Sequence, residues 1–167
     1  FTHDTNRPNH KGLARWLRSH CWIGYDPSQF KPNDDRNPPQ ESLRQDLAWI
    51  RAAGFTGVVT FGSGGARGPL PTSAKQENLA VIAGIWNAND QREIESATKQ
   101  ADLIDAFCVG HNGLRDGRYH FDELQACMRL VRERTGKPVS TSEEARMYRH
   151  DPGLVSCGDW LFPDAHI

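Results

Sequence analysis

Six short apolar segments of this chain each end in polar or aromatic residues whose types are suited to chemistry. The segments cover residues 22–27, 57–63, 80–87, 107–113, 138–144 and 159–166. The candidate functional residues at their ends are Tyr25, Asp26, Trp86, Asn87, His111, Asn112, Glu143, Asp164 and His166. Carboxylates and imidazoles transfer protons, and an aromatic ring beside amides and carboxylates combines an apolar surface with hydrogen-bonding groups. These residue types indicate acid–base chemistry or the binding of a carbohydrate.

Glu143 is the candidate catalytic residue. Glu144 follows it, and successive residues of an extended segment point to opposite sides, so only one of the two carboxylates can face a site. We assign the site to Glu143, first as an acceptor for a sugar hydroxyl and second as a proton donor. The alternative is a solvated carboxylate at the start of the helix that follows.

Trp86 with Asn87, and Tyr25 with Asp26, are predicted to bind substrate. An indole ring suits the apolar side of a sugar ring, and the neighbouring amide suits its hydroxyls. The alternative for Trp86 is packing in the core. The alternative for Asp26 is a turn, because Pro27 follows it.

Asp164 and His166 lie two residues apart, so in a strand both project to one side. We expect this pair to bind substrate, and the alternative is a buried histidine whose hydrogen bond the carboxylate satisfies. Together with His111, Asn112 and Glu143, these side chains also offer ligands for a divalent metal. Their spacing matches no metal motif, so the expected metal content is none.

Helical and strand patterns alternate along the chain. Apolar residues recur at helical spacing over residues 40–53, 90–104 and 121–136, each time between apolar segments. Strands that alternate with helices form a parallel sheet, and chemistry in such folds occurs at the carboxyl ends of the strands. We predict an α/β fold, a parallel (β/α)8 TIM-type barrel with about six of its eight strands present, in preference to an open doubly wound sheet.

Residues 1–167 are predicted to form a single barrel domain, with residues 1–20 as an N-terminal arm or short helix. A barrel of this type typically has about 250 residues, and the last apolar segment has no closing helix after it. We therefore expect the domain to be incomplete at its C-terminus. Open strand edges seek partners, so either a further C-terminal segment or a homo-oligomer is expected to complete the barrel.

Composition argues against several classes of partner. The chain has 20 basic and 21 acidic residues, well mixed, which predicts no nucleic acid and no anionic membrane as a partner. It has neither a bilayer-spanning apolar run nor a signal-peptide pattern, so we expect a soluble protein, periplasmic or extracellular only if an export signal was removed. The four cysteines are far apart and predict free thiols; no cofactor is expected.

The order of these segments resembles glycoside hydrolase family 17 and related bacterial β-glucan-active proteins. The similarity rests on WIGYDP at 22–27, VGHNG at 109–113, PVSTSEE at 138–144 and DWLFPDAH at 159–166. It is collinear over residues 22–166 and most specific over residues 108–144. The resemblance implies a (β/α)8 barrel that acts on, or binds, β-glucans with 1,3 linkages.

The chain departs from that family at its catalytic carboxylates. The family has Asn-Glu after Val-Gly, where this chain has His111 and Asn112. An amide at position 112 cannot exchange a proton at neutral pH. The family's nucleophile lies on a seventh strand, beyond Ile167. Glu143 stands where related sequences have the Glu of a PVTTAE segment.

Three functions follow from these observations and stay open at this stage. A glycoside hydrolase or transglycosylase that acts on an oligo- or polysaccharide of the β-glucan type is favoured by the collinear resemblance. A carbohydrate-binding pseudoenzyme on the same barrel is favoured by Asn112. A metal-dependent barrel hydrolase is favoured by the imidazoles and carboxylates at the strand ends.

Overall fold

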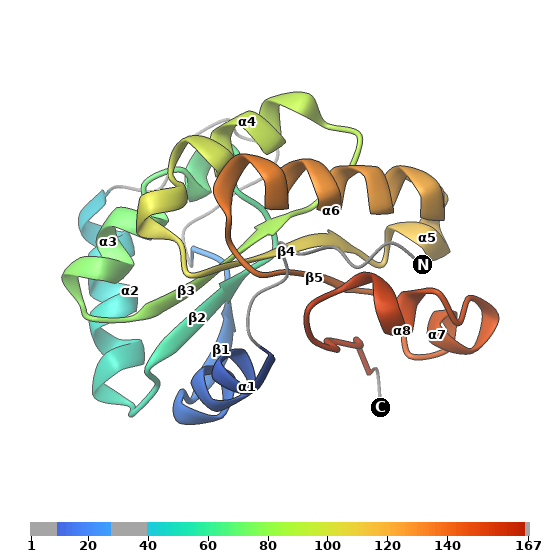
Figure 1. Ribbon diagram of the computed structural model, residues 1–167. Coiled ribbons are helices and arrows are strands. Elements are labelled where there is room, and N and C mark those ends of the chain that lie inside the picture. Colours follow the sequence, from blue (N-terminus) through green and yellow to red (C-terminus); the bar gives the residue numbers. More distant parts are fainter. Residues whose placement is uncertain (1–9, 28–39, 166–167) are drawn as a thin grey trace.

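The computed structural model describes residues 10–27 and 40–165, which contain one parallel sheet (Figure 1). Its five strands lie side by side in the order of the sequence, and each pairs in parallel with the next. They are β1 (Trp22–Tyr25), β2 (Gly57–Thr60), β3 (Ala80–Ile85), β4 (Ala106–His111) and β5 (Val139–Ser142). This sequential parallel order is that of a partial TIM-barrel-like sheet, which confirms the predicted α/β fold class.

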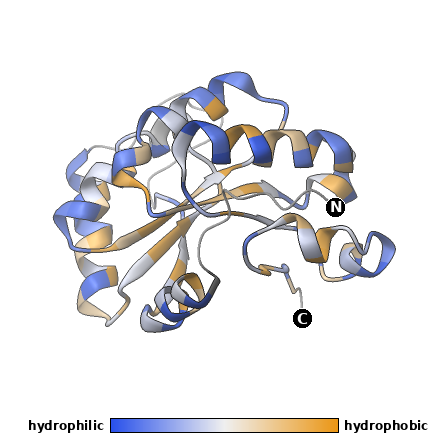
Figure 2. Ribbon diagram, viewed as in Figure 1, coloured by the Kyte–Doolittle hydropathy of each residue, from blue (hydrophilic) through white to orange (hydrophobic). Residues whose placement is uncertain are grey.

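Helices connect the strands and cover the two faces of the sheet unequally (Figure 1). The longer ones are α1 (His10–Ser19), α2 (Gln40–Ala52), α3 (Leu70–Gln76), α4 (Gln91–Lys99) and α6 (Phe121–Thr135). The short ones are η1 (Gly65–Arg67), η2 (Ala101–Leu103), α5 (Gly113–Asp116), α7 (Met147–His150) and α8 (Leu154–Cys157). Apolar colour concentrates along the strands and on the helix sides that face them (Figure 2).

The larger apolar core lies between the sheet and helices α2, α3, α4 and α6. Val58, Val81 and Phe107 point into it from three neighbouring strands and are fully buried. The smaller core lies on the opposite face, where Val59 and Ile82 contact α1 and the C-terminal segment. Because both faces are covered, β2, β3 and β4 are mainly apolar rather than alternating, as in parallel sheets generally, whereas β5 buries one valine and three hydroxyl side chains.

Local signals in the sequence set the ends of the main helices. The carboxylate of Asp90 accepts hydrogen bonds from the backbone amides of Arg92 and Glu93 and so begins α4. Gly136 ends α6 at a φ of 66°, a conformation that costs glycine little. The next strand starts three residues later, which places the end of β5 beside the end of β4.

The sixth predicted strand, residues 159–166, is not a regular strand in the described residues. It begins beside β5, where the Asp159 amide donates to the Val139 carbonyl, and it returns at an isolated parallel bridge between Glu144 and Asp164. Between these points the segment leaves the ladder. Pro163 has no N–H to donate there, and Phe162 packs against the inner face of the sheet instead.

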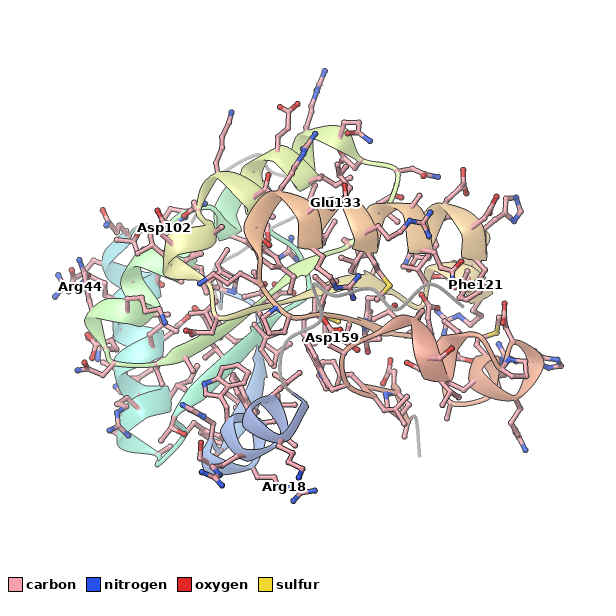
Figure 3. All side chains as sticks on the ribbon, in the orientation of Figure 1. Arg18, Arg44, Asp102, Phe121, Glu133 and Asp159 are labelled. Atoms are coloured by element: carbon pink, nitrogen blue, oxygen red, sulfur yellow. The ribbon has the colours of Figure 1, made fainter. Side chains whose placement is uncertain are left out.

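A buried ion pair fixes the start of this C-terminal segment. The Asp159 carboxylate accepts from Nε and Nη2 of Arg132, each at 3.3 Å, and from the Val139 amide at 2.8 Å. Asp159 lies under α6, as Figure 3 shows. The pair thereby ties α6, β5 and the C-terminal segment together. None of the helices in the described residues combines the length and the apolar character needed to span a bilayer.

Candidate functional site

A pocket of about 120 Å³ opens at the carboxyl ends of β2 to β5. Its walls come from the ends of four neighbouring strands and from the C-terminal segment. The lining residues are Val59, Thr60, Phe61, Gly84, Cys108, Gly110, His111, Ser142, Phe162, Pro163 and Asp164. Most of this surface is apolar, with a few hydroxyl, imidazole and carboxylate groups, which is the usual make-up of a small-molecule site.

Asp164 joins the C-terminal segment to the end of β4. Its Oδ2 atom accepts a 2.6 Å hydrogen bond from the side-chain amide of Asn112, and it lies 3.7 Å from Nε2 of His111. The His111 and Asp164 side chains are 19% and 22% exposed, so both can be reached from the pocket. The pair can therefore hold and transfer a proton.

Aromatic rings border the imidazole of His111 on two sides. The ring centroid of Phe61 lies 5.0 Å from that of His111, and the ring centroid of Trp86 lies 5.2 Å away. The guanidinium of Arg118 lies 4.4 Å above the Trp86 ring and donates to the backbone carbonyl of His111. Trp86 does not line the pocket, but it is 40% exposed and lies beside His111, so we describe its indole as part of the pocket rim rather than of the core.

Glu143 lies behind the pocket wall and is fully buried. It accepts a 2.6 Å hydrogen bond from the Tyr119 hydroxyl and bonds of 3.2 Å from the backbone amides of Gly113 and Leu114. Burial raises the pKa of this carboxyl, although the three donors oppose the rise. Glu143 is absent from the pocket lining, and its role as proton donor or hydroxyl acceptor stays a prediction.

The neighbouring Glu144 is held by two arginines. Arg115 donates to its Oε1 atom, and Arg146 pairs with its Oε2 atom. The hydrogen bond from Arg115 is the main cause that keeps the pKa of Glu144 below its usual value. Glu143 and Glu144 thus point to different surroundings, as alternation along an extended segment requires.

Among the other predicted site residues, Tyr25, Asp26 and Asn87 lie outside the pocket lining. The Tyr25 hydroxyl donates to the buried carboxylate of Asp46 at 2.8 Å, and burial raises its pKa above the usual value. Asp26 accepts two hydrogen bonds from the guanidinium of Arg67. The side-chain oxygen of Asn87 accepts from a backbone amide two residues later, which makes a local turn. His166 lies outside the described residues.

The side chains considered as metal ligands do not converge. In residues 10–27 and 40–165, no three His, Cys, Asp or Glu side chains lie close enough together to hold a metal ion. Glu143 is directed to Tyr119 and to the α5 amides instead of to His111 and Asp164. The metal-dependent hydrolase is therefore not supported.

The pocket also contains Cys108, whose pKa is raised to about 12 by burial and by the charge of Glu143.

Several pocket residues were missed by reasoning from the sequence. Thr60 ends β2 and Phe61 follows it, both within the cluster at residues 57–63, for which no site residue is predicted from the sequence. Ser142 ends β5 directly before the glutamate that was chosen. Their positions at strand ends were the available signal, because small hydroxyl and apolar side chains carry no distinctive chemistry of their own. Phe162 had no comparable signal, since it reaches the pocket from an irregular segment.

Comparison with known proteins found similar folds among solved structures. No protein-family model matches the sequence, and a search of curated proteins found no match. Among solved structures, N-acetylneuraminate lyase from Proteus mirabilis superposes with a TM-score of 0.61 at 15% identity, covering 89% of this chain and 56% of that one. The N-acetylneuraminate lyase from Mycoplasma synoviae gives 0.59 at 13% identity, covering 89% and 55%. The chain thus spans a little over half the length of these lyases.

These comparisons correct the family predicted from the sequence. The structural neighbours named above are lyases rather than glycoside hydrolases of family 17, and no family model matches the sequence. The predicted glycosidase activity on β-glucans and the related pseudoenzyme are therefore wrong. The physical reason is that strand, turn and helix recur in the same order in (β/α) barrels of many functions, so collinear strand ends report the fold rather than the chemistry. The amide at position 112, where that family has a carboxylate, was the feature of the sequence that disagreed with the predicted family.

Proposed function

We propose that this chain forms part of a lyase-type enzyme that breaks or forms a carbon–carbon bond in a small hydroxylated carbonyl compound, with His111 as the group that transfers the proton. The observation that carries the proposal is the distance of 3.7 Å between His111 Nε2 and Asp164 Oδ2 at the wall of the pocket. Both side chains belong to the set predicted from the sequence to contact substrate. The lyases that share the fold support the reaction class by analogy only.

The proposed step is a proton transfer coupled to bond cleavage. Neutral His111 takes the proton from a hydroxyl that lies two carbons from the substrate carbonyl. The oxygen then forms a carbonyl, the carbon–carbon bond breaks, and the electron pair passes to the original carbonyl as an enolate. The imidazolium returns its proton to the enolate carbon. Asp164 stabilises the imidazolium and orients the ring, and Asn112 holds Asp164 through the bond of 2.6 Å.

The other pocket groups suit the remaining parts of such a substrate. The Ser142 hydroxyl lines the pocket and can donate to the oxygen that becomes the enolate. Phe61 and Phe162 offer an apolar wall for the carbon chain. Trp86 lies at the rim beside His111 and is proposed to contact the distal end of the substrate. A volume of about 120 Å³ limits the group held inside to a few heavy atoms.

An amine-based route is not available to the described part of the chain. Lyases that work through a Schiff base need a lysine beside the substrate carbonyl. Lys75 pairs with Asp105, and no lysine is among the residues that line the pocket. For the residues that the structure describes, acid–base catalysis by the imidazole of His111 is therefore favoured over covalent catalysis by a lysine.

Two assays test the proposal. The protein is incubated with N-acetylneuraminate or with 4-hydroxy-2-oxopentanoate, and the release of pyruvate is followed. In parallel, exchange of the pyruvate methyl protons in D₂O is followed by proton NMR, which detects enolate formation without cleavage. We expect His111→Asn to lower either rate by roughly 100-fold or more, since general acid–base catalysis contributes about that much.

Two variants make the test specific. Asp164→Asn is expected to lower the rate less than His111→Asn, because it removes the orienting charge but leaves the base. His150→Asn, at the exposed end of α7, is the matched control and is expected to leave the rate unchanged. Full activity in His111→Asn would overturn the proposal, and so would the absence of both cleavage and exchange with these compounds.

A further inference from the structure

Glu143 is the largest polar side chain among the fully buried residues, and the proton transfer proposed above does not use it. It lies directly after Ser142, which ends β5 and lines the pocket. Because neighbouring residues in an extended segment point to opposite sides, Glu143 is directed away from the pocket and toward the turn between β4 and α5. Its carboxylate therefore contacts the backbone of Gly113 and Leu114, which directly follow His111 and Asn112.

Glu143 makes hydrogen bonds to the start of α5 and does not line the pocket. Oε1 accepts from the Gly113 amide and Oε2 from the Leu114 amide, both at 3.2 Å. These are two of the amides that a helix start leaves without partners inside the helix. The side chain of Asn112, which occupies the capping position, makes no such bond and donates to Asp164 instead. Glu143 thus supplies from another strand the capping bonds that Asn112 does not make.

The turn that Glu143 holds is conformationally demanding. Asn112 adopts a φ of 55° and Gly110 a φ of 79°. A residue other than glycine in the left-handed region costs free energy and persists only where its surroundings fix it. The Tyr119 hydroxyl, which donates to Glu143 and accepts from the Gly113 amide, closes the same network. The network fixes the backbone that directly follows His111 and Asn112.

We propose that Glu143 is a positioning residue: its buried carboxylate holds the β4–α5 turn at Gly113 and Leu114 and thereby sets the imidazole of His111 and the amide of Asn112 against Asp164. The importance of Glu143 for catalysis rests on the proton transfer proposed above. Its role in placing the imidazole of His111 does not depend on that proposed reaction. The alternative is a carboxylate that only stabilises the fold, with no effect on the contact between His111 and Asp164.

The experiment measures the coupling between His111 and Asp164 by NMR titration, which needs no substrate. In the otherwise unchanged protein, Asp164→Asn is expected to lower the pKa of His111, because the imidazole loses a carboxylate partner that lies 3.7 Å away. In the Glu143→Gln background the same change is expected to lower that pKa by less than half as much. Comparing the two backgrounds cancels the direct effect of the Glu143 charge on the imidazole.

Asp46→Asn provides the matched background. It also neutralises a buried carboxylate that accepts from a tyrosine, but its partner Tyr25 lies at the end of β1, away from the turn. The full effect of Asp164→Asn is expected to persist there. An undiminished effect in the Glu143→Gln background would overturn the proposal. Loss of the effect in both backgrounds would also overturn it, because the coupling would then reflect general loosening of the fold.

A second measurement covers the case in which Glu143→Gln does not fold. In the unaltered protein the amide protons of Gly113 and Leu114 are expected to shift together as Glu143 takes up a proton, and the His111 ring signals are expected to shift at the same pH. The proposal would be overturned if the His111 ring signals did not shift over the pH range in which Glu143 takes up its proton. The lyase assays are independent: inactivity with intact coupling would reject the proposed function and leave the positioning role standing.

Discussion

The guanidinium of Arg118 contacts Trp86 and His111, which come from two neighbouring strands. Its Cζ atom lies 4.4 Å from the ring centroid of Trp86, and its Nη2–H is donated to the carbonyl of His111. Trp86 follows β3, and His111 ends β4. A second nitrogen of Arg118 donates to Asp116 at 2.6 Å, which directs the plane of the guanidinium. One side chain thereby joins the rim of the pocket to the turn that carries the candidate base.

Arg118→Lys is expected to loosen this rim. A lysine keeps the charge but cannot cover the indole with a planar group while donating to two acceptors. We expect the free energy of unfolding to fall by about 0.5 to 1 kcal/mol, the usual size of a cation–π contact at a partly exposed site. Urea denaturation measures this, with exposed Arg92→Lys on α4 as the control. An equal effect of both changes would show that the contact contributes nothing.

The ion pair between Arg132 and Asp159 is expected to be important for the stability of the C-terminal segment. Arg132→Met leaves the buried Asp159 carboxylate with only the Val139 amide as a donor. Removing one member of a buried pair costs about 3 to 5 kcal/mol. The same segment carries Asp164, so ligand binding at the pocket is expected to weaken as well.

Arg134→Met is the control for this change, because Arg134 lies exposed on the same helix. Thermal denaturation should show little change for Arg134→Met and a large drop for Arg132→Met. The double variant Arg132→Met with Asp159→Asn should recover part of the loss, since no unpaired charge then stays buried. A loss as large as that of the single variant would indicate that shape rather than charge sets the cost.

The elements of this fold were predictable because periodicity is a local property. The apolar pattern over residues 40–53 and the capping position of Asp90 specify helices without reference to the rest of the chain. The sixth strand was predicted wrongly as regular. Pro163 already argued against a regular strand in the sequence, whereas the inward packing of Phe162 depends on the neighbouring strand. Strand ladders are decided between segments, so a single segment does not reveal where its ladder breaks.

The site was predictable only in part. His111, Asn112 and Asp164 were selected as residues at strand ends, but the bond between Asn112 and Asp164 joins positions 52 residues apart. Such a contact depends on the relative register of β4 and the C-terminal segment. Alternation indicated correctly that Glu143 and Glu144 diverge. It did not reveal that neither of them lines the pocket, because that depends on which face of the sheet the helices cover.

Gly84 is expected to tolerate no side chain. A Cβ atom there would lie 2.2 Å from the Thr60 carbonyl oxygen, so even alanine would force the ends of β2 and β3 apart. Overpacking of this kind costs about 1 to 3 kcal/mol. Gly84→Ala should therefore lower the midpoint of urea denaturation. Gly12→Ala in α1, with nothing within 4 Å of its Cβ, should leave the midpoint unchanged or raise it.

Glu143 should make the stability of the protein depend on pH in a way that is opposite to most carboxylates. Burial raises its pKa in the folded protein above the value of the unfolded chain. The folded protein then binds the proton more tightly, so protonation stabilises the fold. This contribution is complete below the unfolded pKa, near 4.5, and is lost as pH rises through the higher pKa of the folded state.

Comparison with Glu143→Gln isolates that contribution, because the glutamine has the same shape and does not titrate. The free energy of unfolding of the unaltered protein, minus that of the variant, should fall as pH rises from 4 to 8 and level off above the folded pKa. Urea denaturation at several pH values measures the difference and cancels the titration of all other groups. A difference that rises with pH would mean that the hydrogen bonds from Tyr119, Gly113 and Leu114 outweigh burial and hold the pKa of Glu143 below its usual value.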